Sequence, residues 1–175
     1  MLQNPERVVT RSVKKGICQL IDPAINDILM ENKEHFVIPA SSVATVQADN
    51  SLTHAFLVLT KVRYSKIPVL GADDQFVGLL SMPMITETML GLEQLSFAKL
   101  DELCVGDVMQ KDVATIENPY ATEEVLHLLV DNPFLPVVAS TGEFTGIVTR
   151  REWMKTFNYL THNIGKEYKL NRIEK

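Results

Sequence analysis

The stretch FVGLLS at Phe76–Ser81 returns 68 residues later as FTGIVT at Phe144–Thr149. Each copy has a glycine between apolar residues and ends in a hydroxyl residue, a composition typical of a buried β-strand. Two further landmarks recur in the same order. VATV at Val43–Val46 matches VATI at Val113–Ile116, and IPV at 67–69 matches LPV at 135–137. Such internal similarity predicts a fold built from two copies of one unit.

Each unit is expected to have the order β-α-β-β-α. The first helix is indicated by apolar residues at positions i, i+3, i+4 and i+7, namely Leu52, Ala55, Phe56 and Leu59. In the second unit, Asn118–Pro119 predicts an N-cap followed by the first helical position. A strand–helix–strand step implies a right-handed crossover onto one sheet. A unit of about 55 residues would be marginally stable alone, so the two units are expected to share a core.

The repeat divides the chain into five parts. Residues 1–22 form a leader, for which disorder is favoured over a minor-groove arm or a targeting peptide. Residues 23–92 hold the first unit with a preceding helix, 93–104 a helical linker, 105–160 the second unit, and 161–175 a polar tail.

The composition limits the partners. The chain has 46% hydrophobic residues, 22% charged residues and a net charge of −5, which is ordinary for a globular protein but unsuited to bulk binding of nucleic acid or anionic membrane. No apolar run approaches the ~20 residues of a membrane span. Cys18 and Cys104 form no CxxC motif, which indicates neither a disulfide framework nor a zinc site and favours a cytoplasmic location.

The motif after the third strand of each unit, GLLSMPM at Gly78–Met84 and GIVTRRE at Gly146–Glu152, resembles that of the CBS domain. The hydrophobic–Pro–Val sequence before each hairpin matches as well. CBS domains occur in tandem as Bateman modules, and the resemblance covers about Glu31–Asn163. It implies an α/β (α+β) fold, adenine-containing ligands in clefts between the paired units, and an antiparallel homodimer.

The chain departs from the CBS pattern where many members carry a ribose-binding aspartate. Met84 stands there in the first unit and cannot accept a useful hydrogen bond. Glu152 stands there in the second unit. It is either a ribose ligand or part of a capping box with Thr149, and the capping box is favoured. A simple AMP or ATP site is therefore in doubt.

A closer resemblance is to the stand-alone cyclic di-AMP-binding CbpB/DarB proteins of Gram-positive bacteria. The matching stretches are Ala40–Ala44, Ala55–Lys61, Tyr64–Ser65, Gly91–Leu100 and Thr149–Arg151. The resemblance implies a ligand with two phosphates and two adenines. It assigns ligand contacts to Ala44, Tyr64, Ser65, Thr149, Arg150 and Arg151.

Arg150 and Arg151 stand where the closing helix of the second unit begins, although cations oppose the helix dipole at that end. A bound phosphate would make the placement favourable. The alternative is that both are solvated, or pair with acids such as Glu152. The first-unit equivalents, Met82 and Pro83, are uncharged, so one phosphate site per chain is expected.

The adenine side is assigned to the first unit. Ala44 would let backbone groups approach the purine, and the Ser65 hydroxyl could donate or accept. Tyr64 is equally compatible with stacking and with packing. Lys66 would add charge, but an exposed lysine is favoured. For the second-unit residues Phe134 and Pro136, core packing is favoured.

No sequence pattern assembles a catalytic or metal site, since the four histidines are scattered and neither a P-loop nor GxGxxG occurs. The sequence therefore favours a non-catalytic regulator that binds cyclic di-AMP. By resemblance, its partner would be an enzyme such as a Rel-type (p)ppGpp synthetase. The alternatives are an AMP-, ADP- or ATP-sensing regulator of an enzyme or transporter, and a structural CBS pair without a ligand.

Overall fold

The computed structural model describes residues 21–31, 33–90 and 97–167. Almost all of the expected leader, residues 93–96 of the expected linker, and residues 168–175 of the expected tail lie outside the described residues. Within the described part, the tail is helical as far as Glu167, because the last helix continues through it.

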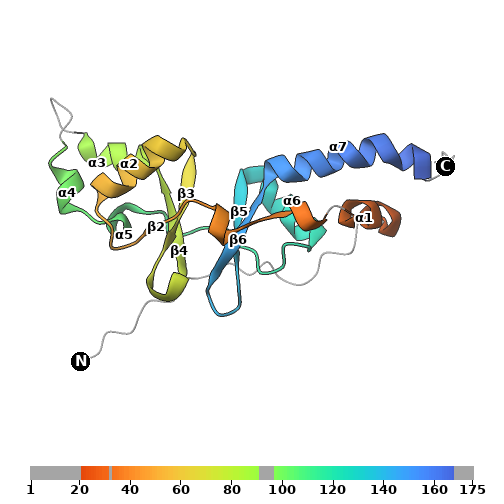
Figure 1. Ribbon diagram of the computed structural model, residues 1–175, viewed down its shortest axis with the longest axis horizontal. Coiled ribbons are helices and arrows are strands. Elements are labelled where there is room, and N and C mark those ends of the chain that lie inside the picture. Colours follow the sequence, from red (N-terminus) through yellow and green to blue (C-terminus); the bar gives the residue numbers. More distant parts are fainter. Residues whose placement is uncertain (1–20, 32, 91–96, 168–175) are drawn as a thin grey trace.

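Two three-stranded sheets stand side by side, each with helices packed on it (Figure 1). One sheet has the order β2-β3-β4 and the other β1-β6-β5. The strands are β1 (Val37–Pro39), β2 (Val46–Gln47), β3 (Lys66–Leu70), β4 (Phe76–Ser81), β5 (Phe134–Val138) and β6 (Phe144–Thr149). The α-helices are α1 (Pro23–Met30), α2 (Leu52–Val62), α3 (Met82–Met89), α4 (Lys99–Glu102), α5 (Val105–Val108), α6 (Thr122–Asp131) and α7 (Arg150–Glu167). Short 3₁₀ turns lie at Lys33–His35, Ala40–Ser42 and Ala72–Asp74.

The duplication is confirmed in the two hairpins. Val69 pairs with Gly78 in the antiparallel ladder of β3 and β4, and Val137 pairs with Gly146 in that of β5 and β6. Both ladders shift register at the next residue. The leading strand of each unit is shorter than expected: β2 holds two residues, and Ile116 makes a single parallel bridge to Val137.

The N-cap expected at Asn118 is wrong, because α6 begins at Thr122. The Asn118 side chain instead accepts a hydrogen bond from the Tyr120 N–H at 3.0 Å, and its carbonyl accepts one from the Ala121 N–H at 3.2 Å. These local bonds close a turn ahead of the helix, which is the competing use of an asparagine side chain.

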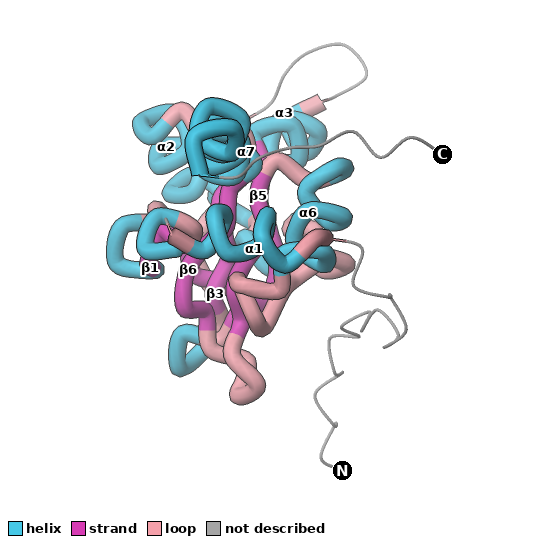
Figure 2. Tube along the Cα trace, turned by 90° about the vertical axis from the view of Figure 1, so that its right-hand side faces the viewer, coloured by secondary structure: helices cyan, strands magenta, loops and turns pink. Residues whose placement is uncertain are grey.

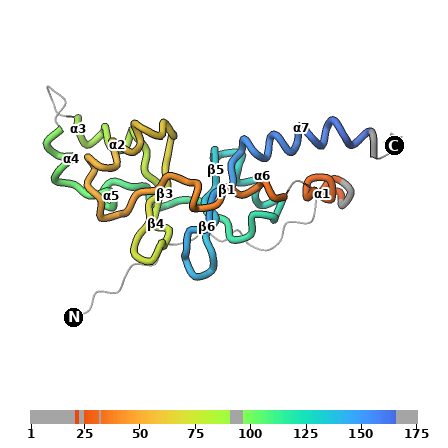
Figure 3. Tube along the Cα trace, viewed as in Figure 1, coloured from red at the N-terminus to blue at the C-terminus, as the bar shows by residue number. Residues whose placement is uncertain are grey.

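The two units exchange segments in a way that the sequence did not reveal. Strand β1 belongs to the sequence of the first unit but pairs with β6 of the second, with Ile38 opposite Ile147. In return, Gln110 lies antiparallel to Leu79 of β4, with reciprocal backbone hydrogen bonds of 2.8 and 3.0 Å. Figure 3 traces the first crossing, from α1 through β1 toward the other sheet. The second sheet is thus extended by strand β1 from the first unit's sequence, and the first sheet by Gln110 from the second unit's sequence.

This exchange explains the glycine of each repeat motif. A Cβ on Gly146 would overlap the carbonyl oxygen of Ile38, and one on Gly78 would lie 2.5 Å from that of Gln110. The crossing backbone therefore needs glycine beneath it.

A Gly146→Ala variant is expected to lower the free energy of unfolding by about 1–3 kcal/mol, the usual cost of overpacking, because β1 must shift. Urea denaturation measures the change. Gly165→Ala on α7 is the matched control, since a Cβ there meets nothing within 4 Å. That control should be neutral or stabilising. Equal effects from the two variants would contradict the close approach of β1.

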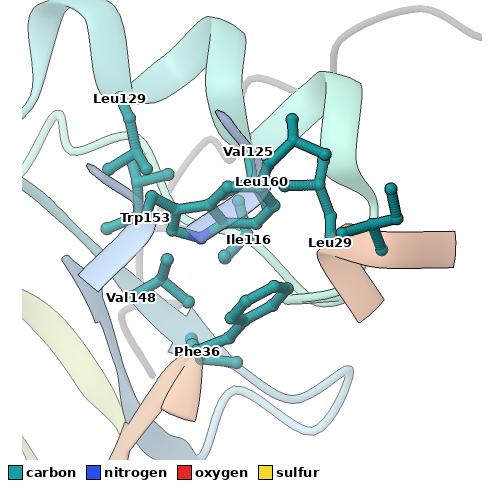
Figure 4. Packing of buried hydrophobic residues seen from close by; sticks show 11 residues of the cluster. Leu29, Phe36, Ile116, Val125, Leu129, Val148, Trp153 and Leu160 are labelled. Atoms are coloured by element: carbon teal, nitrogen blue, oxygen red, sulfur yellow. The ribbon is translucent and has the colours of Figure 1, made fainter. Parts of the chain in front are cut away.

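Each unit has its own core. In the first unit, helices α2 and α3 cover one face of the sheet, with Leu52, Ile67, Leu80 and Ile85 fully buried. In the second, Trp153 of α7 packs against Phe36, Val148 and Leu160 (Figure 4). Helix α1 was expected to lead into the first unit, and it forms as predicted. It packs on α7, however, and contributes Ile28 and Leu29 to the second core.

A third apolar cluster joins the units, as the shared core required. Phe76 and Phe144 stack there with ring centroids 6.1 Å apart, and Leu70 and Leu79 are buried beside them. The Phe76 N–H also donates to the carbonyl of Gly142 at 3.0 Å, which links the two hairpin turns. Across the described ranges, no helix is both long and apolar enough to cross a membrane.

Candidate functional site

The segments that carry the residues assigned to the ligand lie at one end of the interface between the units. Helices α2, α3 and α7 all lie at the same end of the strands (Figures 1 and 2). Strand β3 begins at that end after α2, and β6 finishes there before α7. The parallel pairing of Val46 with Val69 places Ala44, two residues earlier, beside the first half of β3. The topology therefore directs Ala44, Tyr64 and Ser65 of the first unit toward the same end as Thr149, Arg150 and Arg151 of the second.

The first-unit residues are accessible there. Helix α2 ends at Val62, and its C-cap residue Arg63 adopts a left-handed conformation with φ of 58°, so the chain turns sharply into β3. Tyr64 is 56% exposed and Ser65 is exposed, while Ala44 is half-buried. More than half of the Tyr64 side chain is thus accessible to a ligand among the described residues.

Thr149 caps α7. Its hydroxyl oxygen accepts a hydrogen bond from the Glu152 N–H at 3.3 Å, which is the Thr149 half of the expected capping box. The Glu152 carboxylate accepts a hydrogen bond from the Lys155 ammonium group at 2.7 Å and forms an ion pair with it. Glu152 is therefore engaged within its own helix, and in this geometry it does not neutralise the neighbouring arginines.

Arg150 has a structural partner that the sequence did not disclose. Its Nε donates to the carbonyl of Leu129 at 2.7 Å and its Nη2 to that of Val130 at 3.0 Å. These are carbonyls of the last turn of α6, which lack partners within the helix and carry the negative end of its dipole. A guanidinium has five N–H donors, so three of those on Arg150 remain. Arg150 is thus stabilised at the start of α7 because it also lies at the end of α6.

An Arg150→Ala variant is expected to lose about 1–2 kcal/mol of unfolding free energy, because the α6 carbonyls lose charged donors at an exposed site. Chemical denaturation followed by circular dichroism measures the loss. Arg150→Lys, which restores the charge but not the two-pronged geometry, should recover part of it. A fully stable alanine variant would contradict the capping role.

Arg151 differs from its neighbour. Its side chain is exposed and makes no hydrogen bond or ion pair with the residues that the structure describes. Backbone donors at the start of α7 are partly used, since the Arg150 N–H donates to Pro133 at 2.9 Å and the Glu152 N–H to Thr149. Anion binding at this helix start would therefore depend on the arginine side chains more than on the backbone.

Two other sequence expectations have clear outcomes. Phe134 packs against the apolar cluster between the units and Pro136 is buried, so both are packing residues as favoured. Lys66 is half-buried rather than exposed, and its ammonium group donates to the Gln110 side chain at 2.8 Å. Strand alternation could have predicted that Lys66 lies on the face of β3 opposite to Ile67 and Val69, but it could not have predicted the hydrogen bond to Gln110.

The described residues offer no metal centre, since no three His, Cys, Asp or Glu side chains among them could hold a metal ion. His54 on α2 and His127 on α6 are both exposed. The arrangement at the interface end consists of guanidinium groups, hydroxyls and an exposed aromatic side chain. Such groups bind and orient a ligand, and they include no nucleophile paired with a base.

A model of the CBS domain matches residues 34–91 and 105–158, one copy in each unit. The chain belongs to the CBS domain family. Among curated relatives, the cyclic di-AMP receptor B of Bacillus subtilis is 37% identical over 131 residues, which cover 75% of this chain and 89% of that protein.

Solved structures of CBS proteins are also similar to this chain. The Listeria monocytogenes CbpB protein, in complex with cyclic di-AMP, is 48% identical with a TM-score of 0.68, covering 72% of this chain and 94% of that one. The Streptococcus agalactiae CbpB is 26% identical with a TM-score of 0.78, covering 87% and 96%. This tandem CBS chain therefore groups with the CbpB proteins.

The two CBS units are chemically unequal at the helix that follows the third strand. Helix α7 of the second unit begins with Arg150 and Arg151, whereas α3 of the first begins with Met82 and Pro83. The duplicated backbone therefore presents cations at one of two equivalent positions.

Proposed function

We propose that this CBS protein is a non-catalytic, cytoplasmic regulator that binds cyclic di-AMP at the interface end formed by Ala44, Tyr64, Ser65, Thr149, Arg150 and Arg151. The observation that carries the proposal is the exposed guanidinium of Arg151, without a partner in the described structure, in a chain 48% identical to a CbpB solved with cyclic di-AMP. An unpaired arginine at a helix start is the kind of group that a phosphate stabilises.

The residues fit the ligand by chemical type. Each phosphate of cyclic di-AMP carries one negative charge. Arg151 would bind one of the two phosphates, and the free N–H donors of Arg150 would lie beside it. An adenine would stack on the exposed Tyr64 ring and approach the backbone at Ala44, while the Ser65 hydroxyl could donate or accept a hydrogen bond.

Isothermal titration calorimetry tests the proposal with cyclic di-AMP, cyclic di-GMP, AMP and ATP in parallel. Submicromolar binding of cyclic di-AMP alone is the expected result. Cyclic di-GMP has the same phosphates, so it controls for purely electrostatic attraction. Preferential binding of AMP or ATP would replace the proposal with the mononucleotide-sensing alternative, and binding of none of the four would overturn it.

Regulation follows from linkage, because a module without catalytic groups acts by binding a partner differently in its free and liganded states. We infer a homodimer, supported by large apolar side chains exposed on three helices: Leu57 on α2 (61%), Val130 on α6 (71%) and Met154 on α7 (60%). Sedimentation velocity tests the dimer. A Rel-type (p)ppGpp synthetase is the proposed partner, and a pull-down unaffected by added cyclic di-AMP would count against a nucleotide-controlled contact.

A further inference from the structure

Lys66 lies on the face of β3 that is turned toward the second unit. Along this strand, Ile67 and Val69 enter the core of the first unit, whereas Leu70 belongs to the cluster between the units. Because side chains alternate along a strand, Lys66 shares the inner face with Leu70. Phe134, the equivalent residue of the second unit, packs against the same cluster. Lys66 of the first unit thus occupies the position at which the second unit has an aromatic residue.

The Lys66 ammonium is held by neutral groups only. It donates to the Gln110 Oε1 atom at 2.8 Å, and the Gln110 Nε2 atom donates in turn to the Asp112 carbonyl at 2.9 Å. The Gln110 backbone is fixed by its two hydrogen bonds to Leu79. This chain of hydrogen bonds positions the ammonium and uses one of its three N–H donors.

No carboxylate balances this charge in the described structure. Lys66 forms no ion pair with a described residue, unlike Lys155, which pairs with Glu152. A half-buried cation has lost part of its hydration, and without an opposite charge that loss is uncompensated. The position is one where an anionic ligand would be stabilised.

We propose that Lys66 is a second phosphate ligand, which selects a ligand with two separate phosphates over one with a single phosphate. This inference rests on the proposed binding of cyclic di-AMP. Arg151 stands at the start of α7 in the second unit, and Lys66 at the start of β3 in the first. The start of α7 and the start of β3 lie at the same end of the interface, so one cation from each of these two elements faces a ligand bound there. Gln110 is a positioning residue, because it holds the ammonium without a charge of its own.

Calorimetry with cyclic di-AMP tests Lys66 through a charge-removing and a charge-retaining variant. Lys66→Gln is expected to weaken binding by roughly 10- to 100-fold, the scale of a lost hydrogen bond to a charged group. Lys66→Arg should stay within about threefold of the unmodified protein, because the charge is kept. Lys99→Gln on α4, an exposed lysine of the linker, is the matched control and should change nothing. Circular dichroism confirms that each variant is folded.

A double-mutant cycle separates positioning from general stability. Gln110→Leu should weaken binding several-fold on its own, and should add little to Lys66→Gln, because both act through the same ammonium. Independent, fully additive losses would contradict the positioning role.

The outcomes distinguish a failure of the Lys66 inference from a failure of the proposed function on which it rests. If the unmodified protein binds cyclic di-AMP and Arg151→Ala weakens it, but Lys66→Gln binds as well as the unmodified protein, the Lys66 inference is overturned and the proposed function stands. If the unmodified protein does not bind cyclic di-AMP at all, both are overturned.

Discussion

A Trp153→Ala variant is expected to lower the free energy of unfolding by about 3–5 kcal/mol, the usual cost of truncating a buried tryptophan. Trp153 is 1% exposed, and its ring centroid lies 4.5 Å from that of Phe36 and 6.3 Å from that of Phe157. Phe36 precedes β1 and Phe157 follows on α7. The indole therefore joins the N-terminal segment to the second unit, and alanine would leave a cavity at that junction.

Urea denaturation followed by far-ultraviolet circular dichroism measures this loss, since Trp153 is the one tryptophan of the chain and its fluorescence disappears in the variant. Trp153→Phe is the matched control. The indole Nε1 is buried without a hydrogen-bond partner among the described residues, so phenylalanine removes an unsatisfied donor while keeping most of the packing. It should cost about 1 kcal/mol or less. An alanine variant as stable as the phenylalanine variant would contradict the packing of this core.

The hairpins and helices of the repeat could be predicted because their signals are local. The apolar run and its glycine fix β4 and β6, and the spacing of Leu52, Ala55 and Leu59 fixes α2. The cap at Thr149 was also predictable, because both partners of its hydrogen bond lie within four residues. Asn118 shows the limit of such reasoning, since a short polar side chain satisfies a turn as readily as a helix end.

The exchange of segments between the units was not predictable from one sequence. Strand β1 has three residues, which carry no clear period, and it pairs with a strand that begins more than 100 residues later. The partners of Arg150 are similarly remote: Leu129 and Val130 precede it by about 20 residues, and only the fold brings the end of α6 to the start of α7. For the same reason, the bond from Lys66 to Gln110 follows from topology alone.

The placement of two adjacent arginines at one helix start thus has two different physical explanations. Arg150 neutralises the carbonyl end of α6, so its position is favourable without any ligand. Arg151 has no such compensation within the described structure. Substitutions at these neighbours should therefore separate stability from binding, which a purely structural pair or a purely functional pair would not do.

Arg151→Ala is expected to weaken cyclic di-AMP binding by about 1.5–3 kcal/mol, or roughly 10- to 150-fold in Kd, because a charged donor to phosphate is lost. Its unfolding free energy should change by less than about 0.5 kcal/mol, as for an exposed side chain without partners. Calorimetry gives the first quantity and urea denaturation the second. Arg151→Lys should bind with intermediate affinity, since it retains the charge but not the bidentate geometry.

Lys99→Ala, which removes an exposed cation from α4, is the control for net charge, and it should leave both quantities unchanged. Raising the salt concentration should weaken the unmodified protein's binding more than that of Arg151→Ala, because the variant has one charged contact fewer. An Arg151→Ala variant that binds cyclic di-AMP normally would exclude Arg151 from the site. The attraction for phosphate would then have to come from the remaining donors of Arg150 and from Lys66.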